Sequence, residues 1–226
     1  MLIRGTLGVM NKLFLMLRRI YSARNLGWQA GGVVATVLLV SLGVDWWYFI
    51  HLRNSIIFPV FSLAGLLGFF VPLLLVLGML CAGWIAKNAK LVATGLAAAW
   101  AGGLGLFISS FYKFWTGRAH PPYVGNGALD VASQADISHA FHFGFGREGV
   151  FWGWPSSHTA VAFAMSVAIA VMYRDKKWVG GIAVVYAAYI ALGASMSFHW
   201  LSDVVMGIIV GTIVGHAVGS VTRESR

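Results

Sequence analysis

Residues 54–86 read NSIIFPVFSLAGLLGFFVPLLLVLGMLCAGWIA, and this stretch holds no Asp, Glu, Lys or Arg. A helix that crosses the roughly 30 Å hydrocarbon core of a bilayer needs about 20 mostly apolar residues. Within the stretch we place the span near Val60–Trp84, where Pro72 predicts a kink that neighbouring helices must accommodate. This segment alone predicts an integral membrane protein.

The rest of the chain repeats the same pattern between its charged residues. Five further apolar runs lie at Asn25–Val44, Leu91–Tyr112, Gly149–Tyr173, Trp178–Ser202 and Val204–Thr222. The sequence therefore predicts an all-α, polytopic membrane protein in which six transmembrane helices form one bundle over residues 25–222. A cytoplasmic or interfacial segment, 1–24, precedes this bundle, and a cytoplasmic tail, 223–226, follows it.

Two segments of mixed character lie outside these spans. Residues 1–24 intersperse Leu, Phe and Met with Arg and Lys, which is typical of an amphipathic helix at the membrane interface. The segment lacks the uninterrupted apolar region of a secretory signal, so we expect it to be retained. The segment DWWYFIHLRN at Asp45–Asn54 predicts a membrane boundary, with Trp46, Trp47 and Tyr48 as interfacial anchors.

The composition agrees with a membrane protein. Hydrophobic residues make up 59% of the chain and charged residues only 10%, whereas soluble domains average about 25% charged residues. The single cysteine, Cys81, excludes a disulfide scaffold. The net charge of +9 comes from basic residues scattered between apolar runs, which indicates membrane topology rather than nucleic-acid binding. We therefore expect membrane lipids as surroundings and no nucleic-acid partner, while the oligomeric state stays undetermined.

The distribution of Lys and Arg between the loops predicts the orientation. With the N-terminus in the cytoplasm, twelve of the 16 basic residues fall on the cytoplasmic side. The opposite side, called the trans face below, holds only Arg53, Lys113, Arg118 and Arg147. We therefore expect both termini in the cytoplasm. The compact size favours a bacterial inner membrane, with the trans face in the periplasm.

The trans face also collects most of the residues that can do chemistry. Six of the seven histidines and five of the seven acidic residues fall there, together with a long polar stretch, Lys113–Trp154. Long loops between helices are more often functional than passive connectors. Cations and histidines gathered on one face predict an anion-binding site.

The first local motif on this face is KFWTGRAHPP, residues 113–122. A lysine and an arginine in a turn shaped by Gly and Pro can converge on phosphate oxygens, the lysine as a point charge and the arginine as a planar fork. The alternative is that Lys113 and Arg118 merely extend from a helix end towards the membrane surface.

The second motif is PSSH, residues 155–158, which opens the fourth predicted span. Small hydroxyl residues at a helix N-terminus offer donors beside free backbone N–H groups, and the helix dipole favours an anion there. His158 can then supply or accept a proton. The alternative is a plain serine cap, with His158 as a packing residue.

The third motif is HWLSD, residues 199–203, between the last two predicted spans. Positions i and i+4 share a helix face, so the carboxylate of Asp203 can orient the imidazole of His199. An imidazole held in this way has one nitrogen fixed as a donor and the other available as a base or nucleophile. The alternative is a structural His–Asp pair that joins two helices.

In this order, the three motifs resemble those of the type 2 phosphatidic acid phosphatase (PAP2) superfamily, K-x6-R-P, P-S-G-H and S-R-x5-H-x3-D. The resemblance implies a six-helix bundle with its active site at the trans surface. It also implies hydrolysis of a phosphate ester or anhydride through a phosphohistidine, with no metal and no other cofactor.

The resemblance also implies roles for individual residues. His199 attacks phosphorus, Asp203 orients it and stabilises its cationic form, and His158 protonates the leaving oxygen. Lys113 and Ser156 bind the phosphate oxygens.

The chain departs from the family motifs at several positions. His120 occupies the arginine position of the first motif, Ser157 replaces the glycine of the second, and Leu192 and Gly193 replace Ser-Arg in the third. Arg118 or Arg147 can supply the guanidinium of one missing motif arginine, while His120 and Ser157 add hydrogen-bond donors to the phosphate site. Since the nucleophile, its acid and the acid–base histidine are all present, we expect a divergent but active enzyme.

Three alternatives stay open. A lipid phosphotransferase of the same superfamily passes the phosphate to another alcohol, and some such relatives also lack the third-motif arginine. A metal site can use His139 and His142, which are spaced i,i+3, and a transporter can use His216. For the phosphatase we expect a lipid-linked phosphate substrate, such as phosphatidate, phosphatidylglycerophosphate, polyprenyl diphosphate or a phosphate of lipid A.

Overall fold

The computed structural model describes all residues except 1, 123–129, 131–132 and 147–152. Its described part is built from α-helices without a strand; Arg118 and Phe141 form an isolated β-bridge. The helices are α1 (Leu2–Ile20), α2 (Ala23–Ser41), α3 (Val44–Arg53), α4 (Phe58–Phe61), α5 (Ala64–Ile85), α6 (Ala89–Thr116), α7 (Ser157–Met172), α8 (Lys177–Ser197) and α9 (Leu201–Glu224). The predicted all-α class is therefore confirmed.

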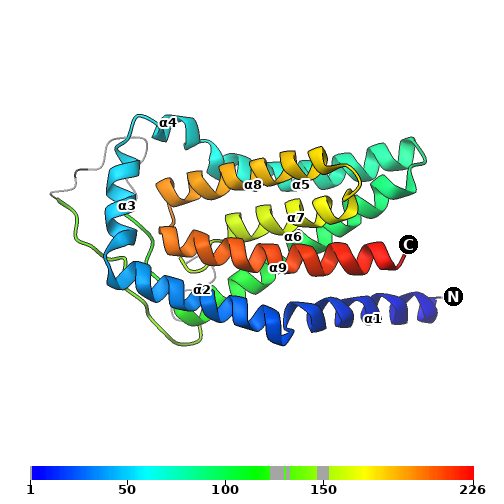
Figure 1. The fold of residues 1–226 in the computed structure, drawn as a ribbon, viewed down its shortest axis with the longest axis horizontal. Coiled ribbons are helices and arrows are strands. Elements are labelled where there is room, and N and C mark those ends of the chain that lie inside the picture. Colours follow the sequence, from blue (N-terminus) through cyan, green and yellow to red (C-terminus); the bar gives the residue numbers. More distant parts are fainter. Residues whose placement is uncertain (1, 123–129, 131–132, 147–152) are drawn as a thin grey trace.

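Helices α5 to α9 run along a common axis, and α2 lies beside α9 (Figure 1). Both termini lie at one end of this bundle, and α3 crosses the opposite end (Figure 1). The location of both termini in the cytoplasm stays a prediction.

The centre of the bundle is the contact between α7 and α9, where glycines bring the two backbones together. Gly207, Gly211, Gly215 and Gly219 recur every four residues along α9, so they share one face. A Cβ added at Gly211 would lie 2.5 Å from the Ala160 oxygen, and one at Gly207 would lie 2.8 Å from the Ser156 oxygen. Small residues of this kind allow membrane helices to pack closely.

Replacing Gly211 with alanine is expected to destabilise the bundle, because the new methyl group would overlap α7. Overpacking of this kind costs about 1–3 kcal/mol, which should lower the thermal unfolding midpoint in detergent. Gly31→Ala in α2 is the matched control, since nothing lies within 4 Å of a Cβ added there. Equal midpoints for the two variants would contradict this account of the α7–α9 contact.

The number of membrane spans is only partly settled by the structure. Among the described residues, four helical stretches are long and apolar enough to cross a membrane: Phe58–Ile85, Ala89–Thr116, Lys177–Ser197 and Leu201–Glu224. Helices α2 and α3 pass the same test together but are bent by 73° at their junction, which gives up to five spans. Helix α7 is a shorter apolar helix. The count of six spans therefore stays a prediction.

The N-terminal segment forms the helix α1. Met16 and Ile20 are buried among residues of the α7–α9 core, and Arg19 forms an ion pair with Glu224 at 2.6 Å. These contacts tie the end of α1 to the end of α9. An interfacial position for the rest of α1 stays a prediction.

Helix α3 is more deeply embedded than its aromatic sequence predicts. Trp46 packs against Trp200 at a ring-centroid distance of 6.2 Å, and the Tyr48 hydroxyl lies 2.9 Å from that of Ser195. Of the three proposed interfacial anchors, only Trp47 is largely exposed, at 58%. The ring of Trp46 therefore also packs within the protein, and its role as an interfacial anchor stays a prediction.

Candidate active site

His199 lies in the short connection between α8 and α9, and Asp203 lies in the first turn of α9. One carboxylate oxygen of Asp203 accepts a hydrogen bond from the backbone N–H of Trp200, at 3.1 Å, and lies 3.2 Å from Nδ1 of His199. The same oxygen therefore caps the helix and orients the imidazole. With Nδ1 directed at a carboxylate, Nε2 is the nitrogen left for a substrate. The predicted His–Asp pair is present in the structure.

The charge state of His199 follows from its burial, because its ring is only 2% exposed. Burial lowers the pKa of His199 well below its usual range, although the hydrogen bond with Asp203 opposes this effect. The imidazole is therefore neutral near pH 7, which is the form that has a lone pair for nucleophilic attack.

The second motif forms the start of α7. The Ser156 hydroxyl is fully buried and accepts from the backbone N–H of Thr159 at 3.3 Å, as a helix cap does. The Ser156 backbone N–H donates to the Asp203 carbonyl at 2.9 Å, which fixes the start of α7 beside the start of α9. This contact brings the His158 ring to a centroid distance of 6.3 Å from the His199 ring.

The first motif begins in the last turn of α6 and continues past it. Lys113 is only 4% exposed, and the negative end of the helix dipole favours its positive charge there. His120 follows the helix; its Nδ1 lies 2.8 Å from the Phe198 carbonyl, and its ring centroid lies 5.5 Å from that of His199. The three motifs therefore meet around His199.

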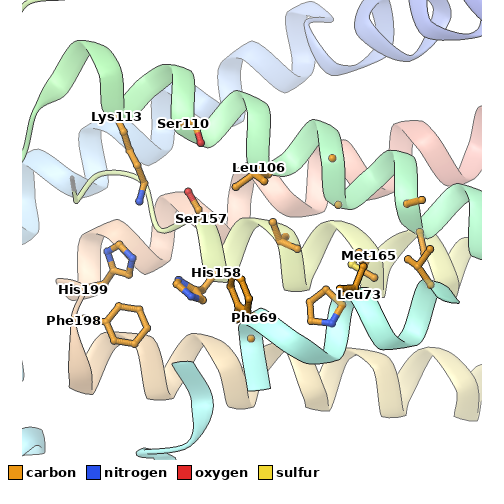
Figure 2. Close-up of a pocket in the computed structure, with 18 of the residues that line it drawn as sticks. Phe69, Leu73, Leu106, Ser110, Lys113, Ser157, His158, Met165, Phe198 and His199 are labelled. Carbon is orange, nitrogen blue, oxygen red and sulfur yellow. The ribbon is translucent and has the colours of Figure 1, made fainter. Parts of the chain in front are cut away.

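A cavity of about 540 Å³ joins these residues to the apolar interior of the bundle. Its polar end is lined by Lys113, His120, Ser157, His158 and His199. Figure 2 shows Lys113 extending from α6 towards the side on which the two histidines lie. The rest of the cavity follows α5, α6 and α7 away from this polar end and includes Phe69, Leu73, Leu106 and Met165.

The structure separates the predicted phosphate ligands into two groups. Lys113, His120 and Ser157 line the cavity, and the Ser157 hydroxyl accepts from that of Ser109 at 2.9 Å. Ser156 and Arg118 are fully buried and do not line it. Arg147, the other proposed replacement, lies outside the described residues.

Arg118 is directed at two carboxylates behind His199. Its guanidinium donates to Asp45 at 2.7 Å, to Asp203, and to the Ser138 carbonyl at 2.6 Å. Sequence reasoning counted Asp45 among the acidic residues of the trans face and in an aromatic boundary segment but gave it no role, although an acidic residue beside an apolar membrane segment is itself a signal of function. Asp45 is the residue near the site that sequence reasoning missed.

Close packing explains why position 193 holds no arginine. A Cβ added at Gly193 would overlap the Ala64 side chain and lie 2.6 Å from the Phe61 oxygen. The ends of α4 and α5 therefore occupy the space that a side chain at 193 would need. Among the described residues that line the cavity, Lys113 is the only Lys or Arg.

The alternative metal site gains no support from geometry. The described residues include no group of three His, Cys, Asp or Glu placed to hold a metal ion. His139 and His142 lie outside any helix, so the spacing that suits an i,i+3 pair does not apply to them.

The three motifs lie within a region that matches a known protein family. The PAP2 superfamily matches residues 90–226, which contain all three motifs and helices α6 to α9. The chain belongs to the PAP2 superfamily. The PAP2 match leaves α1 to α5 outside, and with them Asp45.

One curated relative adds detail to the PAP2 assignment. The chain is 31% identical over 118 residues to the lipid A 4′-phosphatase of Porphyromonas gingivalis. That region makes up 52% of this chain and 46% of the relative, so the chain spans about half the length of the relative it matches. No solved structure matches the chain.

Proposed function

We propose that this PAP2 protein is an integral membrane phosphatase that removes phosphate from a lipid-linked substrate through a phosphohistidine on His199. One observation carries the proposal: a single cavity joins the two histidines and Lys113 at one end to an apolar channel at the other. A phosphorylated lipid has the same two parts, a charged head and an apolar tail. The lipid A phosphatase relative supports the same substrate class.

The first chemical step transfers the phosphate group to His199. Nε2 attacks phosphorus, and the bond between phosphorus and the lipid oxygen breaks. His158, whose protonated form the bound phosphate anion favours, gives its proton to that oxygen. Asp203 holds Nδ1–H and compensates the positive charge that develops on the imidazole ring. The neutral form of His199 favoured by burial is the form that this step needs.

The second step returns His199 to its starting state. Water gives a proton to His158 while its oxygen attacks phosphorus, the nitrogen–phosphorus bond breaks, and inorganic phosphate leaves. Lys113, His120 and Ser157 bind the phosphate oxygens in both steps, since all three line the polar end of the cavity. Ser156 contributes by capping α7, so that the N-terminal N–H groups of the helix face the anion.

The membrane arrangement completes the proposal. Helix α3 lies at the end of the bundle opposite the termini, and the start of α9, which follows His199, lies at that end (Figure 1). We place this end on the periplasmic side of a bacterial inner membrane and both termini in the cytoplasm, since Lys and Arg gather at the other end.

A phosphate-release screen tests this function. Purified protein in mixed micelles is offered lipid A, phosphatidate, phosphatidylglycerophosphate and a polyprenyl diphosphate, with lipid A first because of the relative. Release of inorganic phosphate without an alcohol acceptor supports a hydrolase, whereas release of product only with an acceptor indicates a transferase. Loss of turnover with EDTA would contradict the metal-free mechanism.

The apolar part of the cavity gives a separate prediction about substrate chain length. Gly103 lines the cavity, and nothing lies within 4 Å of a Cβ added there, so Gly103→Leu places a side chain in the open channel. We expect kcat/KM for a long-chain lipid phosphate to fall about tenfold or more, while hydrolysis of a short water-soluble phosphate ester stays unchanged.

Gly181→Leu is the matched control for this variant. Gly181 lies on the exposed side of α8, does not line the cavity, and also has nothing within 4 Å of an added Cβ. Equal losses on long-chain and short-chain substrates in Gly103→Leu would show that the channel does not hold the lipid tail.

A further inference from the structure

Asp45 and Arg118 form a buried ionic network with the acid that orients His199. The side chains of Asp45, Arg118, Ser202 and Asp203 are all fully buried. Arg118 donates to both carboxylates at once, through Nη2 to Asp45 at 2.7 Å and through Nη1 to Asp203. The guanidinium thus bridges two carboxylates that belong to different helices, α3 and α9.

Asp45 is held in place by the first turn of α9. Its Oδ1 accepts from the Ser202 backbone N–H at 2.9 Å, and its Oδ2 accepts from the Ser202 hydroxyl. Ser202 also accepts from Nη1 of Arg118 at 2.7 Å. Every carboxylate oxygen in the network therefore has a donor, which is what keeps buried charges tolerable.

The charges of this network have a consequence for His199. Two carboxylates and one guanidinium leave a net charge of −1 beside a neutral imidazole. When His199 becomes a cationic phosphoimidazole, the buried group becomes neutral. Without the charge of Asp45, the charges of Arg118 and Asp203 would cancel each other, and the network would hold no net negative charge to stabilise a cationic imidazole at His199.

We propose that Asp45 is a positioning residue for catalysis: it binds Arg118 and so leaves the charge of Asp203 available to His199. This proposal rests on the proposed function, because it assigns a role in phosphate transfer to His199. It also gives Arg118 a different task from phosphate binding, in agreement with its absence from the cavity wall. Lys113 remains the cavity-lining cation for the substrate.

The test compares Asp45→Asn, Arg118→Gln and the double variant with wild type. Asp45→Asn removes the net negative charge and should lower kcat about 10²-fold with little change in KM. Arg118→Gln leaves two buried carboxylates without their cation and should also lower kcat. The double variant restores the net charge of −1, so its kcat should exceed that of Asp45→Asn by about tenfold.

If Asp45 and Arg118 had a purely structural role, the double variant would be no more active than Asp45→Asn, because the losses from the two substitutions would add. A double variant no more active than Asp45→Asn, or wild-type kcat in Asp45→Asn, would overturn the proposal. If thermal unfolding in detergent shows that Asp45→Asn does not fold, Arg118→Lys provides the test of the proposal. It keeps the charge and should retain more kcat than Arg118→Gln, and equal activity of these two would also overturn the proposal.

Asp175→Asn is the matched control, because Asp175 is exposed and pairs with Lys90 at the opposite end of the bundle. A second readout needs no lipid substrate: the rate at which diethyl pyrocarbonate modifies His199, measured by peptide mass spectrometry. This reaction also requires the neutral imidazole to become cationic. We therefore expect the modification rates of the variants to follow the same order as their kcat values. If wild type released phosphate from no lipid, the proposed function would fail, and this readout would still test the role of Asp45.

Discussion

His199→Ala is expected to abolish phosphate release, with kcat reduced by at least about 10³-fold. The variant removes the nitrogen that forms the bond to phosphorus, and with it the imidazole that Asp203 orients. The fold should survive, because Asp203 keeps its bonds to Arg118 and to the Trp200 N–H. The measurement is inorganic phosphate released from the lipid that wild type hydrolyses best.

His139→Ala is the matched control, since His139 is exposed and does not line the cavity. Rapid acid quenching is unsuitable for trapping the intermediate, because a nitrogen–phosphorus bond is acid-labile. Wild type quenched in alkali should carry phosphate on the peptide that contains residue 199. Near-normal turnover in His199→Ala would rule out the phosphohistidine mechanism.

Lys113→Met is expected to lower kcat/KM by about 10²–10³-fold, the range observed when one preorganised donor is removed from a developing charge. Methionine has a similar length but no charge, so the change removes the single Lys or Arg among the described residues that line the cavity. Because the family arginine positions hold His120 and Gly193, the chain has few cations with which to compensate. We expect KM and kcat to change together.

Lys90→Met provides the control within the same helix. Lys90 lies at the other end of α6 and forms an exposed ion pair with Asp175 at 3.2 Å, which contributes little to stability. Its kcat/KM should match wild type. Retention of wild-type kcat/KM by Lys113→Met would show that the phosphate is held by other groups.

Much of the helical framework could be predicted from sequence, because hydrophobic length is a local property. The predicted apolar runs contain most of α2 and of α4 to α9, whereas α3 lies between two of the runs. The length of α7 was harder to predict, since the run Gly149–Tyr173 continues before Ser156, where the buried serine cap begins the helix. The glycine repeat along α9 was visible in the sequence, but its partner helix was not.

The composition of the site could be predicted only in part. The pair His199 and Asp203 was predicted from i,i+4 spacing on one helix, and the structure has the contact. His199 lies in the connection before α9, however, so the contact comes from the carboxylate that caps this helix. Arg118 was proposed as a phosphate ligand because it lies in a basic motif on the trans face. Its guanidinium is instead directed at two acids, and one of them, Asp45, lies 73 positions earlier in the chain. No local pattern joins residues so far apart.

The protein class, the main apolar helices and the order of the three motifs could be predicted from the sequence alone. These properties depend on hydrophobic length and short-range spacing, which each segment carries alone. The lining of the cavity, the close packing at Gly193 and the acids that bind Arg118 depend on how the helices pack against one another. A buried charge takes whatever opposite charge the packed helices bring beside it, and that choice is made between segments rather than within one.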